Sequence, residues 1–398
     1  MMFPPRTPVR VQNAHTCMGS IYEFIAKYER WTADGSADTC DFALGNPQTM
    51  PLEAFVTALR EAAIPKDKAW YAYKMSEPSS REIVSKSLER LTGLQFPHEN
   101  IFMTNGATGA LLVTMNALIG PGDEVIFNSP PWFFYEGMIL NSGGKPVAVD
   151  VDPATFDLDL AGIERAITDN TRFIIVNSPN NPTGKIYSPD TLEKLGKILE
   201  AGSKRIGRPI YLVSDEAYRA IVYDNAKFHS PTTFYKNAIM IYTYGKTLLT
   251  PGQRVGYIAL SPRMDDLEGL RTILFSSQIL SGWAMTSALM QHCLGDLEKM
   301  SLDVKALERR RDRFVKGLRD CGYEVRSPEG AFYITPKTPI EDDVAFADLL
   351  AREGVLCLPG SVVKMKGYLR ASVTAGDEMV ERALPKFAAA RKQVLAAR

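Results

Sequence analysis

The feature that most constrains the fold is a repeated alternation of short apolar runs with segments of helical length. The apolar runs lie at 101–104, 124–127, 146–151, 173–176, 210–213, 238–242 and 255–260. They are rich in Val, Ile and aromatic residues and show little polar alternation, which is typical of strands covered on both faces. Several intervening segments carry helix signals, such as Ser188 as an N-cap before Pro189. The pattern predicts an α/β fold with a mostly parallel, seven-stranded sheet flanked by helices.

The pattern changes after about residue 281. Helices are expected at 302–318, 343–352 and 377–392, and short strands at 323–325, 331–335, 355–358 and 368–373. These elements predict a second, smaller α+β domain, and a chain of 398 residues is longer than the ~250–300 residues at which one core stops growing. The predicted division is an N-terminal arm (1–50) that packs on the small domain, a large domain (51–285) and a small C-terminal domain (286–398).

Composition excludes several classes of protein. Lys and Arg total 46, as do Asp and Glu, so the net charge of zero gives no reason to expect nucleic acid or an anionic membrane as partner. The apolar runs are too short to span a bilayer, and the first residues lack the apolar stretch of a secretory signal. The five cysteines are scattered without a CxxC pair, so neither a disulfide framework nor a metal site is expected. A cytoplasmic location follows as the prediction.

Polar or reactive side chains follow several predicted strands, where ligands gather in parallel α/β sheets. Asp215 is either an ordinary helix N-cap or a carboxylate that meets a cation. Asn181 lies in the turn-rich segment Asn-Asn-Pro-Thr-Gly and offers both a donor and an acceptor. The small residues at 104–110 form either a tight turn or a loop that presents free N–H groups to an anion. Lys246, taken alone, is better explained as a surface residue than as a reactive amine, and Arg254 either clamps the same anion or is a surface arginine.

Spacing excludes two common nucleotide-binding motifs. The sequence Gly-Lys-Thr at 245–247 resembles the end of a P-loop, but that motif needs a glycine at 240, where this chain has Met240. The segment at 106–109 lacks the spacing of the G-x-G-x-x-G fingerprint. Neither segment therefore predicts a nucleotide site.

Taken together in chain order, the motifs form one constellation. A small-residue anion loop is followed by an aromatic residue after Pro-Pro, then NNPTG, DEAY, a lysine and an arginine. This set points to one ligand with a phosphate, a basic ring nitrogen, a phenolic oxygen and an aldehyde, which is pyridoxal 5′-phosphate. The aromatic residue, Trp132, either stacks on that ring or belongs to the core, since three more aromatic residues follow it.

These motifs resemble the class I and II aminotransferases of the fold-type I pyridoxal-phosphate enzymes, from ALGNP at 43–47 to YLR at 368–370. The resemblance implies a homodimeric transaminase with shared active sites and a large domain that holds the cofactor. It would move an amino group between an L-amino acid and a 2-oxo acid by a ping-pong mechanism, through an internal aldimine at Lys246. A lyase, cyclase, oxidase or substitution enzyme on the same scaffold stays an alternative. A non-catalytic sensor is disfavoured, because no basic DNA-binding segment is evident.

The resemblance also implies roles for single residues. Lys246, Asp215 and Tyr218 would be catalytic, with Asp215 on the ring nitrogen. Tyr218 and Asn181 would hold the ring oxygen.

Other residues would bind the remaining parts of cofactor and substrate. Trp132 would cover the ring face. The resemblance places the phosphate on Ala107, Thr108, Thr243, Arg254 and a neighbouring subunit's Tyr71, for which Tyr73 competes. Gly45, Asn181 and Arg370 would bind the substrate α-carboxylate.

Overall fold

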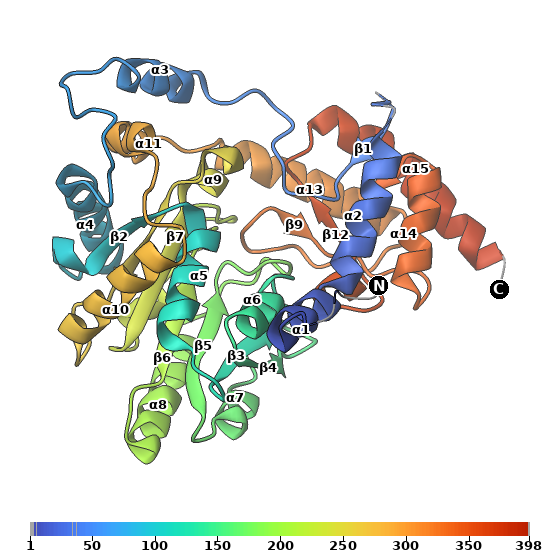
Figure 1. Ribbon diagram of the computed structural model, residues 1–398. Coiled ribbons are helices and arrows are strands. Elements are labelled where there is room, and N and C mark those ends of the chain that lie inside the picture. The colour runs from blue at the N-terminus through green and yellow to red at the C-terminus, as the bar shows by residue number, and fades with distance from the viewer. Residues whose placement is uncertain (1–3, 5, 34, 37, 397–398) are drawn as a thin grey trace.

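The computed structural model describes residue 4 and residues 6–33, 35–36 and 38–396. The strands of its largest sheet are β2 (Ile101–Thr104), β3 (Glu124–Ser129), β4 (Lys145–Asp150), β5 (Thr171–Asn177), β6 (Tyr211–Asp215), β7 (Ala238–Thr243) and β8 (Gly256–Leu260). They lie in the order β2-β8-β7-β6-β5-β3-β4, and β8 alone runs antiparallel to its neighbours (Figure 1). The predicted seven-stranded, mostly parallel sheet is confirmed, with each strand within two residues of its expected bounds.

Two helical layers cover this sheet. The helices are α3 (Glu53–Ala62), α4 (Pro78–Thr92), α5 (Gly106–Leu118), α6 (Tyr135–Asn141), α7 (Leu160–Ala166), α8 (Pro189–Ile206), α9 (Tyr244–Thr247), α10 (Leu267–Leu280), α11 (Ala288–His292) and α12 (Leu294–Leu297). α5, α6 and α10 pack on one face, where Val213 and Ile241 point. α7 and α8 cover half of the other face, and α4, α11 and α12 cover the rest. Burial on both faces explains why the strands are apolar without alternation.

The C-terminal part forms the smaller α+β layer that the sequence predicts. Its elements are α13 (Val304–Asp320), β9 (Tyr333–Ile334), α14 (Asp343–Arg352), β10 (Val355–Leu356), β11 (Leu358–Pro359), β12 (Leu369–Ser372) and α15 (Asp377–Ala396). β11, β12 and β9 make an antiparallel sheet, and α13, α14 and α15 lie beside one another (Figure 1). The strand expected at 323–325 is wrong. Separate hydrogen bonds hold that segment in place of strand pairing. Lys337 N–H donates to the Glu324 carbonyl, and the Tyr323 hydroxyl donates to the Phe387 carbonyl.

The N-terminal arm contains α1 (Val9–Cys17), α2 (Gly19–Thr32) and β1 (Cys40–Asp41), none of which the sequence predicted. α1 lies against α6 of the large sheet, whereas β1 pairs in parallel with β10 of the smaller layer. Met18, Ile21 and Phe24 pack with apolar residues of both layers. The arm thus joins the two layers, and the domain limits at 50 and 285 stay predictions. None of the described helices is long and apolar enough to cross a membrane.

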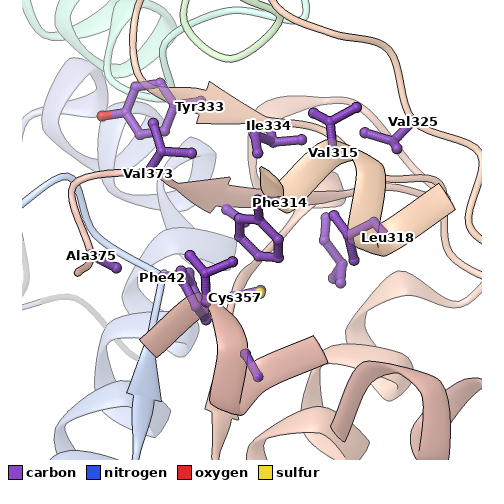
Figure 2. Close-up of a cluster of buried hydrophobic side chains, with 14 of the residues drawn as sticks. Phe42, Phe314, Val315, Leu318, Val325, Tyr333, Ile334, Cys357, Val373 and Ala375 are labelled. Carbon is purple, nitrogen blue, oxygen red and sulfur yellow. The ribbon is translucent and has the colours of Figure 1, made fainter. Parts of the chain in front are cut away.

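The smaller layer has its own hydrophobic core (Figure 2). Phe314 of α13 is fully buried, and its ring centre lies 4.9 Å from that of Phe42 and 5.8 Å from that of Phe387. The arm, α13 and α15 therefore meet at one aromatic contact.

Replacement of Phe314 by alanine should lower the free energy of unfolding by about 3–5 kcal/mol, because it leaves a cavity among buried rings. Urea unfolding followed by circular dichroism measures the change. The matched control on the same helix is Lys316→Ala, whose exposed side chain should alter stability by only about 0.5 kcal/mol. Equal stability of the two variants would contradict this description of the core.

Candidate active site

One cavity collects most of the residues that the sequence singled out. It lies where β5, β6 and β7 end, beside the first turn of α5 and next to β12 of the smaller layer. Its lining includes every predicted site residue except Tyr71, namely Gly45, Ala107, Thr108, Trp132, Asn181, Asp215, Tyr218, Thr243, Lys246, Arg254 and Arg370. The topology brings these residues together because parallel strands end at one edge of the sheet.

Asp215 is the last residue of β6 and is buried. Its Oδ2 accepts a hydrogen bond from the Tyr135 hydroxyl at 2.6 Å, and its Oδ1 accepts one from Ala217 N–H at 3.2 Å. Burial raises the pKa of Asp215, while these two bonds and the charge of Lys246 act in the opposite direction. The carboxylate thus lies in a site where a further cation would hold it ionised.

Lys246 lies on α9, the short helix that follows β7. Thr243 caps this helix, because its hydroxyl accepts from Gly245 N–H and also donates to the Val255 carbonyl at 3.2 Å. The Lys246 Nζ lies 5.8 Å from the Tyr218 ring centre and 5.7 Å from that of Phe332. The amine is therefore held between aromatic faces and points into the cavity that Asp215 also lines.

Arg370 of β12 is a buried cation with unused hydrogen-bonding capacity. Its Nη1 donates to Asn181 Oδ1 and its Nη2 to the Ala43 carbonyl, both at 3.1 Å. Its Nε is buried and has no hydrogen-bond partner among the described residues. A buried guanidinium that meets only neutral acceptors is costly, so this arrangement suits an anion that enters the cavity.

Asn181 is fixed through the loop after β5. Its backbone N–H donates to Asn177 Oδ1 at 2.7 Å, and Asn177 Nδ2 donates to the Asp215 carbonyl at 3.0 Å. The Asn181–Pro182 bond is cis. Two strand ends are thereby linked, and the linkage holds Asn181 against Arg370.

Gly45 lies where no side chain fits. A Cβ there would lie 2.5 Å from the Tyr333 hydroxyl oxygen and 2.8 Å from Phe332 Cε2. The Tyr333 hydroxyl lies 3.4 Å from that of Tyr218. Burial raises the pKa of Tyr218 well above its usual range. For Tyr333 burial acts the same way, but the charges of Arg370 and Lys246 outweigh it and lower the pKa of that phenol.

The first turn of α5 faces the same cavity through Ala107 and Thr108. Gly106 has φ +74°, and a Cβ there would lie 3.0 Å from Arg254 Nη2. Arg254 therefore stacks directly on the start of the helix, where free N–H groups already favour negative charge. Its Nη1 donates to the Pro251 carbonyl at 2.8 Å.

For two of the predicted site residues, Trp132 and Tyr71, the predicted role stays a prediction. Trp132 lines the cavity, and its ring also contacts Phe134 and Tyr135 edge-on, so the stacking and core alternatives both fit the contacts. Tyr71 is exposed outside the cavity, and its hydroxyl donates to the Ala63 carbonyl. Tyr73 is 91% exposed. A contact of Tyr71 with a neighbouring subunit stays a prediction.

Sequence reasoning missed Tyr135 and Tyr333. Tyr135 stands in the aromatic run after Trp132, but the run does not show which ring turns toward Asp215. Tyr333 follows Gly-Ala-Phe in a short strand, and only the pairing of β9 with β12 brings it beside Arg370. Which ring of the aromatic run faces Asp215, and which strand pairs with β9, both depend on tertiary packing.

A family model, two relatives and a solved structure that are similar to this chain are all named as aminotransferases. The model of the family "Aminotransferase class I and II" matches residues 37–387. A "Probable aspartate aminotransferase" of Methanocaldococcus jannaschii is 32% identical over 362 residues, which is 88% of this chain and 92% of the relative. An "Aspartate/prephenate aminotransferase" of Thermus thermophilus is also 32% identical, over 88% of this chain and 90% of the relative. The solved structure of an amino transferase from Eubacterium rectale has a TM-score of 0.88 at 29% identity, covering 94% of this chain and 95% of that one.

Tyr135→Phe should destabilise the ligand-free protein by about 1–3 kcal/mol at pH 8, because it removes a donor from a buried carboxylate. The lost bond raises the pKa of Asp215 further in the folded state. An acid whose pKa is higher in the folded state contributes stability only below that pKa, where the folded protein binds its proton. The loss in free energy of unfolding caused by Tyr135→Phe should therefore be smaller at pH 5 than at pH 8. Urea unfolding at both pH values measures it.

Tyr187→Phe is the control, because Tyr187 is also buried but its hydroxyl bonds to no described residue. A deficit for Tyr135→Phe that does not depend on pH would contradict the proposed effect on Asp215.

Proposed function

The chain belongs to the class I and II aminotransferase family and is a transaminase, and from this premise we propose that it works with pyridoxal 5′-phosphate. It would move the amino group of an L-amino acid to a 2-oxo acid in a ping-pong cycle. The observation that carries the proposal is one cavity that holds a lysine amine, a buried carboxylate and a buried guanidinium with an unpartnered Nε.

The donor set fits this cofactor part by part. The first N–H groups of α5, at Ala107 and Thr108, would hold the phosphate together with Arg254 and the Thr243 hydroxyl. Because Gly106 has no side chain, the Arg254 guanidinium lies directly against the backbone at that end of the cavity.

The ring would lie between the remaining groups. Asp215 would pair with a protonated ring nitrogen, and this cation would supply the charge that the buried carboxylate needs. Tyr218 and Asn181 would bind the ring oxygen, and Trp132 would cover one ring face. When bound, the cofactor supplies an electron-poor ring that takes up the charge left on the substrate α carbon.

The residues of this chain then bind, orient and move a proton. Arg370 holds the substrate α-carboxylate through its free Nε, because the anion neutralises a cation that otherwise meets only neutral acceptors. Because Gly45 has no side chain, Tyr333 packs against its backbone, next to the proposed position of that carboxylate. Lys246, when unprotonated, would accept the proton from the α carbon of the amino donor, and in the second half of the cycle it would give a proton to the α carbon of the product amino acid.

We also propose a homodimer with shared active sites. The end of α10 and the loop after it expose the apolar residues Ile279, Leu280, Trp283 and Met285. A Cβ on Gly109 would lie 3.9 Å from the Trp283 ring, so this exposed patch lies against α5, whose residues Thr108 and Leu111 line the cavity. A partner that covers the patch would also approach the active site. The cytoplasmic location, inferred from the cysteine pattern, stays part of this proposal.

Lys246→Ala should lower the rate of amino transfer by about 10²–10⁴-fold, because the acceptor of the α proton is lost. Coupled assays with a panel of amino acids and 2-oxo acids measure the rate. Lys86→Ala, at an exposed lysine of α4, should leave it unchanged. Release of ammonia in place of transfer to the oxo acid would contradict transamination and favour another reaction on this scaffold.

Leu280→Asp should weaken the dimer, because it places a charge in an apolar patch where Leu280 is 85% exposed. Sedimentation velocity should show a concentration-dependent shift from dimer to monomer. Lys194→Asp, at an exposed position of α8, is the control. A parent protein that is monomeric at micromolar concentration would rule out the shared sites.

A further inference from the structure

Tyr333 reaches the cavity from the smaller layer. It belongs to β9, is buried, and lines the cavity. Because β9 pairs with β12 so that Tyr333 lies opposite Ser372, the ring stands close to Arg370. The hydroxyl points away from the core side chains of Ile334 and Val325 (Figure 2). A tyrosine at the edge of the hydrophobic core therefore presents its polar end to the candidate site.

The Tyr333 ring holds the guanidinium of Arg370 in place. The ring centre lies 4.3 Å from the Arg370 Cζ, a distance at which a cation is attracted to an aromatic ring. Hydrogen bonds to Asn181 Oδ1 and to the Ala43 carbonyl hold the same guanidinium through its two terminal nitrogens. Three contacts, from β9, the loop after β5 and the arm, thus fix the orientation of this cation.

The Tyr333 hydroxyl lies where an anion is favoured. Burial raises the pKa of this phenol, but the charges of Arg370 and Lys246 outweigh that effect and lower it. The hydroxyl oxygen would lie 2.5 Å from a Cβ on Gly45, so it packs directly against the backbone there. Hydrogen bonds to a carboxylate are stronger than bonds between neutral groups. The hydroxyl is therefore well placed to donate to a carboxylate that binds beside Arg370.

The contact with Tyr218 leaves this hydroxyl available. The two hydroxyl oxygens lie 3.4 Å apart, whereas two hydroxyl groups that bond well are about 2.7–2.8 Å apart. In the proposed function Tyr218 binds the ring oxygen of the cofactor. Tyr333 can then direct its own O–H toward the substrate.

We propose that Tyr333 is a substrate-binding residue, whose ring orients Arg370 and whose hydroxyl donates a hydrogen bond to the substrate α-carboxylate. This inference rests on the proposed function, in which the same carboxylate binds to the Nε of Arg370. It gives that anion a neutral donor beside the cation. All of the contacts that support it lie within one chain, so they hold whatever a second subunit adds to the cavity.

Binding of a carboxylate tests the inference without turnover. Calorimetric titration of the cofactor-loaded protein uses 3-phenylpropanoate and succinate, which cannot donate an amino group, and the tighter of the two is the probe. Tyr333→Phe removes only the hydroxyl and should weaken binding of the probe about tenfold, because a hydrogen bond to a charged group is lost. An affinity within threefold of the parent's would overturn the inference and leave the proposed function in place.

The matched control is Tyr323→Phe. Tyr323 is a buried tyrosine of the same layer outside the cavity lining, and its hydroxyl donates to the Phe387 carbonyl. This variant loses a buried hydrogen bond but should bind the probe within twofold of the parent. Equal losses of affinity in the two variants would show that binding depends only on the stability of the layer, and would overturn the inference.

The amino donor tests the same contact during the reaction. The half-reaction with the parent's best donor among the L-amino acids is followed by the absorbance of the cofactor. Because the hydroxyl would hold the carboxylate equally before and during the reaction, Tyr333→Phe should raise the half-saturating donor concentration about tenfold and keep the maximal rate within twofold. A lower maximal rate at an unchanged half-saturating concentration would place the effect on Tyr218 or Lys246, and would overturn the inference.

The part played by the ring is tested by Tyr333→Leu. This variant loses both the hydroxyl and the contact with the Arg370 guanidinium, so it should bind the probe at least threefold more weakly than Tyr333→Phe. Equal affinity of the two folded variants would remove the ring from the inference. If neither probe binds the parent, the half-saturating donor concentration decides in its place, whereas no amino transfer from any amino acid would overturn the proposed function itself.

Discussion

A carboxylate buried at the end of β6 is the constraint around which the site is arranged. Asp215 has two donors, Tyr135 and Ala217, and burial still raises its pKa. A charge in such a place is tolerated only when a cation faces it. The parallel strands supply the geometry, because β5, β6 and β7 end at one edge, where Asn177, Asp215 and Thr243 line the same cavity.

The smaller layer supplies the remaining residues of the candidate site. β12 carries the buried Arg370 to Asn181, and β9 carries Tyr333 to Gly45 and Tyr218. Because these contacts cross between the two layers, a change in their packing would alter the anion site and the phenol pair together. The arm contributes as well, since Ala43 accepts a hydrogen bond from Arg370. In the proposed function, a substrate held at Arg370 would therefore bind to a site that both layers build.

The sequence alone predicted the sheet and the residues at its edge, because both follow from local patterns. Buried strands are continuous apolar runs, and Asp215, Asn181 and Lys246 lie directly after such runs. It did not predict α1 and α2, and it did not identify Tyr135 and Tyr333. Those features depend on tertiary packing: the arm is placed by residues of both layers, Tyr135 by its rotation toward Asp215, and Tyr333 by its position beside Arg370. The strand expected at 323–325 failed because local β propensity needs a pairing partner.

In the proposed function, Lys246 is the amine that reacts with the cofactor. Reduction of the cofactor-loaded protein with sodium borohydride, followed by peptide mapping in a mass spectrometer, tests it most directly. We expect one peptide to carry the reduced cofactor, with Lys246 as the modified residue. Modification of a different lysine, or of none, would contradict it.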